Sequence, residues 1–244
     1  MSVFTVKLAG VPVRVESLFD EVRQLCEAYL CQDEPAFTVR TTPADIAREQ
    51  ETSDREADYE RRPRIRFSGG YLETLAVYRK IVVALLDYDI LLMHGSAVCL
   101  DGQAYLFTAS SGTGKTTHTR LWLNAFPGAF VINGDKPLIR FLDDHCEIFG
   151  TPSAGKEGMN RNTSAPLKAV CVLERGKENH IRREDFSAVL PMVIQQSYRP
   201  RDVVGMSKTL DLIRRMSEFT AFYRLSCNMD PEAAMVSYRG MKDE

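Results

Sequence analysis

A glycine-rich stretch between a predicted strand and a predicted helix constrains this chain most. It follows the apolar residues 104–107, precedes the apolar residues 121–123, and reads Ala109-Ser110-Ser111-Gly112-Thr113-Gly114-Lys115-Thr116-Thr117. In such a turn, successive backbone N–H groups point into one concavity, and the helix N-terminus adds partial positive charge. Gly112 and Gly114 let the backbone approach an anion that a Cβ would keep away. The stretch therefore predicts a phosphate-binding loop.

Individual residues of this loop have separate predicted roles. Lys115 is expected to contact the β- and γ-phosphates of a nucleotide, and the Thr116 hydroxyl is expected to hold a magnesium ion. The usual pattern has glycine at the position of Ala109, where a small residue fits if its φ is negative. The intact Gly-Lys-Thr disfavours the alternative of a serine-rich turn that only caps a helix. The predicted nucleotide contacts are Ser111, Gly112, Thr113, Gly114, Lys115, Thr116 and Thr117.

The segments around the loop resemble two related kinase families. Residues 111–117 are similar to the nucleotide loop of ATP-dependent phosphoenolpyruvate carboxykinases, and their surroundings resemble HPr kinase/phosphorylase. As in that superfamily, a His94-Gly95 segment lies on a strand before the loop, and a strand that ends in an acid, here Asp135, follows it. The resemblance covers about residues 91–173 and implies an α/β fold of α+β character, with a phosphoenolpyruvate carboxykinase-like mixed sheet and a P-loop helix.

The resemblance also implies catalytic roles. Kinases of this superfamily usually have two adjacent aspartates at the end of the strand that follows the loop. One of them binds the metal, and the other takes the proton of the acceptor hydroxyl. This chain has Gly134-Asp135 at that place. Asp135 matches the second acid, so it is expected to hold magnesium or to act as the base, and a base from elsewhere, such as Glu157, stays open. Lys156 is expected to neutralise transition-state charge. His94 is expected to face the phosphate site or to be a hydrogen-bonded core residue.

Together these features predict a kinase that depends on ATP and Mg²⁺ and transfers the γ-phosphoryl group to a hydroxyl. The acceptor is a serine of a peptide or small protein, or a small metabolite. The alternative is a nucleotide-binding regulatory or accessory protein in which the loss of one acid has left weak or no catalysis. A true phosphoenolpyruvate carboxykinase is disfavoured because those enzymes are much longer, and an ordinary P-loop ATPase is disfavoured by the His-Gly strand.

Composition bounds the partners and the location. The 244 residues, 44% of them hydrophobic, suffice for one core plus a small subdomain. A formal net charge of −2 gives no electrostatic reason to expect nucleic acid or an anionic membrane as a partner. Without a long apolar run or a signal-like N-terminus, the chain is expected to be cytoplasmic. The six scattered cysteines are expected to be reduced, and the resemblance to HPr kinases implies a homo-oligomer.

The pattern along the chain predicts two domains. Residues 1–64 are expected to form a small N-terminal α+β lobe, with a hairpin at 4–17, a helix capped by Ser17, a strand at 37–40 and a charged linker or exposed helix at 49–64. Residues 65–244 are expected to form the P-loop kinase-like nucleotide-binding domain, which opens with a core helix at 71–86.

Within the second predicted domain, short strands alternate with few helices. A single strand is expected at 91–100, and a polar loop at 150–166 is expected to close over phosphates. The Arg175-Gly176 pair matches an Arg-Gly signature of HPr kinases in chain order, but its turn-forming neighbours indicate a chance match. Other strands are expected at 103–108, 129–132, 137–142, 146–149, 167–173 and 221–226, and helices after the loop, at 185–196, at 202–219 and from Asp230.

Overall fold

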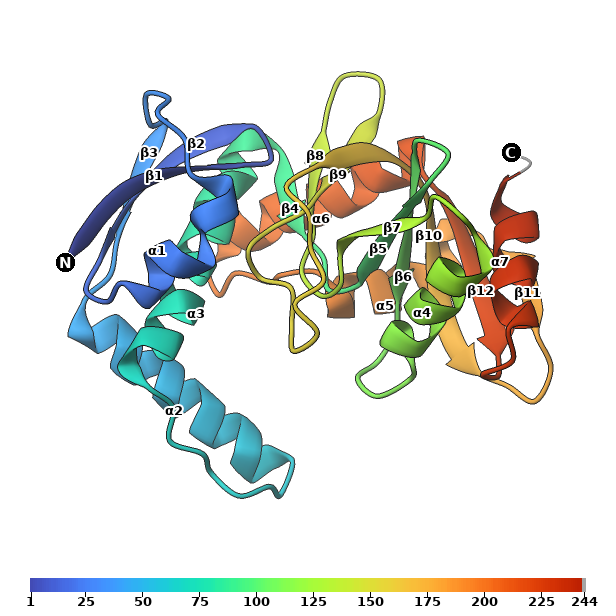
Figure 1. Ribbon diagram of the computed structural model, residues 1–244, viewed down its shortest axis with the longest axis horizontal. Helices are drawn as coiled ribbons and strands as arrows, with labels where there is room; N and C mark the ends of the chain where they lie inside the picture. Colours follow the sequence, from blue (N-terminus) through green and yellow to red (C-terminus); the bar gives the residue numbers. More distant parts are fainter. Residues whose placement is uncertain (243–244) are drawn as a thin grey trace. The chain divides into compact units, whose positions relative to one another are not determined.

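The computed structural model describes residues 1–242, and the chain divides into two compact units, Met1–Ala84 and Leu85–Glu244. The sequence analysis places the boundary at residue 64, whereas the compact units divide after Ala84. Figure 1 shows each unit with its own sheet. None of the helices in residues 1–242 combines the length and apolar character needed to cross a bilayer.

The first unit contains a three-stranded sheet in the order β1-β2-β3. Strands β1 (Ser2–Leu8) and β2 (Val11–Ser17) form the predicted antiparallel hairpin, and β3 (Phe37–Arg40) pairs with β2 in parallel. The prediction that Ser17 caps a helix is wrong, because Ser17 ends β2 and its Oγ donates to the Phe19 carbonyl at 3.1 Å. The helices are α1 (Glu21–Leu25), η1 (Glu27–Tyr29), α2 (Pro43–Tyr59) and α3 (Gly69–Leu85).

Two buried carboxylates join the helices of the first unit to each other and to the sheet. Glu73 of α3 is fully buried and accepts hydrogen bonds from the backbone N–H groups of Leu18, at 2.6 Å, and Phe19, at 2.7 Å. Glu49 of α2 is held by the Arg79 guanidinium of α3 at 2.6 and 2.9 Å. A buried carboxylate without a partner would lower the free energy of unfolding by about 3 kcal/mol or more. These bonds therefore explain why α3 belongs to the first unit.

The second unit is built on a large mixed sheet. Most of its strands follow the order β4-β8-β9-β10-β6-β5-β7, and β12 pairs with both β10 and β11. Residues 164–166 of β10 pair with β9, residues 167–172 pair with β6, and residues 169–175 pair with β12. The strands are β4 (Ile90–Leu92), β5 (Ser96–Leu100), β6 (Gln103–Thr108), β7 (Phe130–Asn133), β8 (Leu138–Phe141), β9 (Cys146–Phe149), β10 (Ser164–Arg175), β11 (His180–Arg183) and β12 (Ala221–Cys227).

Strand direction brings several strand ends to one edge of this sheet. Strands β6 and β10 are parallel, whereas β5 is antiparallel to both β6 and β7. The carboxyl ends of β6, β7 and β10 and the amino end of β5 therefore lie on the same edge. Residues that follow or precede these strands are consequently neighbours in space, although they are far apart in the sequence.

Helices cover both faces of the sheet. On β6, Tyr105 and Phe107 pack with Trp122 on the face of α4 (Lys115–Ala125) and α7 (Glu232–Lys242). Ala104 and Leu106 alternate with them and face α5 (Phe186–Gln196) and α6 (Val203–Phe219) (Figure 1). This period of two is the reason why one strand serves two apolar clusters.

The single strand predicted at residues 91–100 is wrong in one respect. The structure has β4 and β5 there, and they occupy different places in the sheet. Between them, the His94 N–H donates to the Gln196 carbonyl at 2.7 Å, and Thr108 Oγ1 donates to the His94 carbonyl at 2.8 Å. These bonds take the backbone of His94 out of the strand ladder.

Ser237 of α7 joins the two helices on the α4 face. Its Oγ donates to the Ala234 carbonyl at 2.9 Å and accepts from Trp122 Nε1 at 2.8 Å. His118 Nε2 lies 3.2 Å from the same oxygen. Since the hydroxyl proton is already used, His118 must donate from Nε2. One buried hydroxyl therefore satisfies two ring N–H groups of α4.

We predict that Ser237→Ala lowers the free energy of unfolding by about 2 kcal/mol, because the N–H groups of His118 and Trp122 both lose their acceptor inside the core. Denaturant titration measures this loss. Ser217→Ala is the matched control, since the Ser217 hydroxyl is exposed on α6 and only donates to the Arg214 carbonyl. Equal stability of the two variants would contradict the assigned role of Ser237.

Candidate functional site

The loop between β6 and α4 has the backbone that a phosphate cradle requires. Gly112 has a φ of +76° and Gly114 a φ of +124°, both in the region that favours glycine. A Cβ added at either residue would meet no heavy atom within 4 Å. Glycine is therefore favoured at these positions by the left-handed backbone conformation and not by close packing. The space beside both residues is open to a ligand.

Helix α4 begins directly after this loop. Its N-cap is Gly114, and no side chain caps the first turn. The Thr113 N–H and hydroxyl both bond to the Ser110 carbonyl, at 3.3 and 2.9 Å, which closes the turn before the helix. The first N–H groups of α4 and its partial positive charge are thus available to an anion.

Lys115 is a partly buried cation at this helix N-terminus. Its Nζ donates to the Ala109 carbonyl at 3.0 Å, so the side chain folds back over the loop. Burial lowers the pKa of Lys115, and the charge of Asp135 acts in the opposite direction. Lys115 and Asp135 follow strands whose carboxyl ends lie at the same edge of the sheet.

Asp135 and His94 form a hydrogen bond beside the loop. His94 Nε2 lies 3.0 Å from Asp135 Oδ1, and the two side chains keep 36% and 25% of their surface exposed. His94 Nδ1 lies 2.9 Å from Gln196 Oε1, and the Gly95 N–H donates to the Asp135 carbonyl at 2.9 Å. Burial raises the pKa of Asp135, but the His94 hydrogen bond and the charges of Lys136 and Lys115 outweigh it, so the net shift is downward.

Asn133 sets the conformation of the turn that carries Asp135. Its buried Oδ1 accepts from the N–H groups of Asp135, at 2.9 Å, and Lys136, at 2.7 Å. Its Nδ2 donates to Thr151 Oγ1 at 3.0 Å and to the Ser153 carbonyl at 3.3 Å. One amide therefore fixes the turn after β7 and anchors the polar loop that follows β9. The sequence pattern predicts no role for Asn133.

Gly134 occupies the place of the acid that the kinase resemblance leads us to expect. Its N–H donates to the Met159 carbonyl at 2.8 Å. A Cβ at Gly134 would lie 3.4 Å from that carbonyl oxygen and 3.6 Å from the Ala154 carbonyl oxygen. A carboxylate there would be placed beside two carbonyl dipoles of the same sign. These distances are ordinary van der Waals contacts, so the packing of residues 154–159 does not by itself require glycine here.

The remaining predicted site residues lie around this centre. Glu157 pairs with Arg120 of α4 at 2.5 Å, which connects the loop after β9 with the P-loop helix. Lys156 is exposed next to Glu157, and Ser111 and Thr117 are exposed on the P-loop and the first turn of α4. The structure thus brings His94, Lys115 and Asp135 together, while the predicted role of Lys156 has no contact to support it among residues 1–242.

Arg175 is a site residue that the sequence analysis sets aside. The structure places it on the P-loop, where its Nη2 donates to the Gly112 carbonyl at 2.6 Å and its Nε to the Thr113 carbonyl at 3.4 Å. The sequence signal was an arginine two residues after the strand predicted at 167–173, directly before Gly176. Whether such an arginine reaches the loop depends on which strand lies beside its own strand in the sheet. The sequence does not show this strand pairing.

His118 lies on the first turn of α4 but is not available to a ligand. Its ring is 2% exposed and packs edge-on against Phe107, with ring centroids 4.7 Å apart. Its Nδ1 is buried without a hydrogen-bond partner among residues 1–242. Burial lowers the pKa of His118 to about 4. This histidine is therefore a neutral core residue at pH 7.

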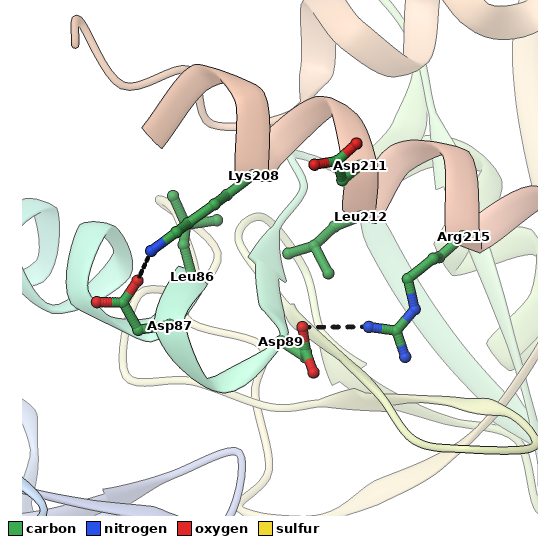
Figure 2. Close-up of a pocket in the computed structure, with 7 residues that line it drawn as sticks. All are labelled: Leu86, Asp87, Asp89, Lys208, Asp211, Leu212 and Arg215. Atoms are coloured by element: carbon green, nitrogen blue, oxygen red, sulfur yellow. Dashed lines mark hydrogen bonds and ion pairs between the residues drawn. The ribbon is translucent and has the colours of Figure 1, made fainter. Parts of the chain in front are cut away.

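A second hollow, of about 330 Å³, lies away from the P-loop, between η2 (Leu86–Tyr88) and α6. Figure 2 shows Lys208 paired with Asp87 at one end and Arg215 paired with Asp89 at the other. Its lining residues are Leu86, Asp87, Asp89, Lys208, Asp211, Leu212 and Arg215. None of them belongs to the P-loop or to the Asp135 turn, so we assign this hollow no part in the candidate site.

Comparisons with known proteins add little to this picture. No family model matches the chain, and no curated protein sequence matches it. Among solved structures, it is similar to the Hpr(Ser) kinase/phosphatase from Coxiella burnetii, with 11% identity and a TM-score of 0.30 over 52% of this chain and 97% of that chain. Because so low a TM-score carries no argument about function, the case for a function depends on the geometry described above.

We predict that the stability of the protein depends on pH through His118. Its pKa is about 4 in the folded protein and ordinarily 6.5, so the unfolded chain takes up the proton first as the pH falls. The contribution of His118 to the free energy of unfolding is complete above pH 6.5 and decreases by about 3 kcal/mol on acidification to pH 4. Unfolding free energies measured from pH 7 to 4 should decrease less in His118→Gln than in the wild type. Exposed His180→Gln is the control and should follow the wild type.

Proposed function

We propose that this chain is a phosphotransferase that uses ATP and Mg²⁺ and moves the γ-phosphoryl group to a hydroxyl acceptor. The acceptor is a serine of a peptide or small protein, or a small metabolite. The observation that carries the proposal is the open loop of Gly112 and Gly114 at the N-terminus of α4, with Lys115 and Asp135 at the same sheet edge. Backbone N–H groups, a helix N-terminus and a lysine are suited to a polyphosphate.

The residues present also fit a magnesium ion bound together with a nucleotide. Residues 1–242 contain no cluster of three or more His, Cys, Asp or Glu side chains that could hold a metal. Magnesium sites in nucleotide enzymes commonly use one or two protein oxygens and complete the shell with water and phosphate. The Thr116 hydroxyl and the Asp135 carboxylate are the protein ligands we propose. Bound magnesium would neutralise charge on the phosphates.

The surroundings of Asp135 support a charged rather than a proton-accepting role. Its lowered pKa keeps the carboxylate ionised at pH 7, which suits a metal ligand and weakens a base. His94, bonded to Asp135 at one ring nitrogen and facing Gln196 at the other, orients that carboxylate. Phosphoryl transfer depends mainly on positioning and charge neutralisation, so one acid at this position is compatible with catalysis.

One observation favours the second candidate, a nucleotide-binding regulatory protein with weak or no catalysis. Gly134 stands where the kinases that the chain resembles have another acid, and a Cβ there would face two backbone carbonyl oxygens, at 3.4 and 3.6 Å. Comparing the affinity for ATP with the turnover on acceptor peptides and hydroxylated metabolites separates the two candidates. Tight binding without labelled product in a screen with γ-labelled ATP would favour the regulatory function.

We predict that Lys115→Ala weakens the binding of Mg-ATP at least about tenfold, because a charge-assisted bond to phosphate is lost. Thr116→Ala should weaken binding only when magnesium is present. Titration calorimetry with and without magnesium measures both effects. Lys208→Ala is the matched control, since Lys208 pairs with Asp87 at the distant hollow. Unchanged affinity of the Lys115 variant would refute the phosphate-loop assignment.

Asp135→Asn is predicted to lower both the magnesium-dependent affinity for ATP and the turnover, because a neutral amide is a poor ligand for magnesium. His94→Gln should reduce turnover less, since it removes only the partner that orients Asp135. His180→Gln, on exposed β11, is the control. If Asp135→Asn reduced turnover while affinity stayed constant, Asp135 would be the base rather than the metal ligand. If neither quantity changed, the proposed function would be wrong.

A further inference from the structure

Arg175 holds the outer side of the P-loop. It is the last residue of β10, and its guanidinium donates to two consecutive loop carbonyls, those of Gly112 at 2.6 Å and Thr113 at 3.4 Å. Neither carbonyl belongs to a strand ladder or to the i→i−4 pattern of α4. Arginine is suited to such a place because its planar group offers several N–H donors in a fixed arrangement.

The sheet explains why this side chain reaches the loop. Strand β10 is parallel to β6, with Val172 beside Thr108, so both strands end at the same edge. Cys171 and Leu173 pack into the apolar cluster of Trp122, on the α4 face. Because side chains alternate along a strand, Arg175 lies on that same face, two residues further along. It therefore emerges beside the loop that leads into α4.

The backbone beneath Arg175 is firmly fixed. Arg175 pairs with Cys227 in the parallel ladder of β10 and β12, and the Gly176 N–H donates to the Cys227 carbonyl at 2.9 Å. A Cβ at Gly176 would lie 1.9 Å from Ser226 Oγ and 3.2 Å from the Glu178 carbonyl oxygen, so a larger residue there would make the Ser226 hydroxyl rotate away. The guanidinium thus extends from a rigid strand end to a loop whose glycines make it intrinsically flexible.

We propose that Arg175 is a positioning residue that keeps the P-loop in its phosphate-binding conformation, an inference that rests on the nucleotide-binding function proposed above. In a trans peptide the C=O and the next N–H point in opposite directions. The Thr113 N–H bonds to the Ser110 carbonyl, so holding the Gly112 and Thr113 carbonyls from outside fixes that closed turn and directs the N–H group of Gly114 to the opposite side of the loop. Arg175 thereby reduces the conformational entropy that the loop loses when it binds an anion.

Hydrogen exchange of the nucleotide-free protein tests this role without any assumption about the ligand. Arg175→Ala should speed the exchange of the Thr113 amide, which donates to the Ser110 carbonyl, about tenfold and weaken Mg-ATP binding about tenfold. Arg175→Lys should remain close to the alanine variant, because one ammonium group does not reproduce the guanidinium fork. Arg182→Ala is the matched control, since exposed Arg182 on β11 pairs with Glu184 and should leave both quantities at the wild-type level.

Each other outcome has a distinct meaning. Weaker binding with unchanged exchange in Arg175→Ala would overturn the proposal in favour of a direct bond to phosphate. Full rescue by Arg175→Lys would also overturn it, because charge alone would then suffice. If the wild type did not bind Mg-ATP, the proposed function would fail, while the exchange rates would still decide whether Arg175 orders the loop.

Discussion

The directions of four adjacent strands are the constraint on which the candidate site depends. Because β6, β7 and β10 run the same way and β5 runs between β6 and β7 in the opposite sense, their ends meet at one sheet edge. The P-loop, Asp135, Arg175 and His94 each lie at one of these ends. No contact between neighbours in sequence could assemble these groups. The backbone ladders, set by buried apolar side chains on both faces, bring them together.

At this sheet edge two charged side chains, Lys115 and Asp135, are partly buried. Burial disfavours the charged forms of Lys115 and Asp135, and each lowers that cost for the other. Hydrogen bonds to His94 and the Asn133 turn fix the carboxylate, and Arg175 fixes the loop carbonyls. The fold itself thus holds the donors and the carboxylate in place.

Sequence reasoning was least informative where one residue serves two distant segments. Asn133 bonds to its own turn and also to Thr151 and Ser153, and Ser237 accepts from two rings that lie more than a hundred residues earlier. The break between β4 and β5 has the same origin, because Gln196 and Thr108 take the backbone groups of His94. Local apolar periodicity contains no trace of such partners, so it predicted one continuous strand.

The sequence by itself determined that a glycine-rich turn joins a buried strand to a helix. Glycine alone accepts the required backbone, and the apolar runs on either side have the right periods. It also determined most of the strands and the long helices. Only the tertiary structure decided that α3 belongs to the first unit, that His118 is buried beyond reach, and that Arg175 lies on the P-loop. These outcomes depend on which strands and helices pair, and pairing is settled by the burial and hydrogen bonding of the whole chain.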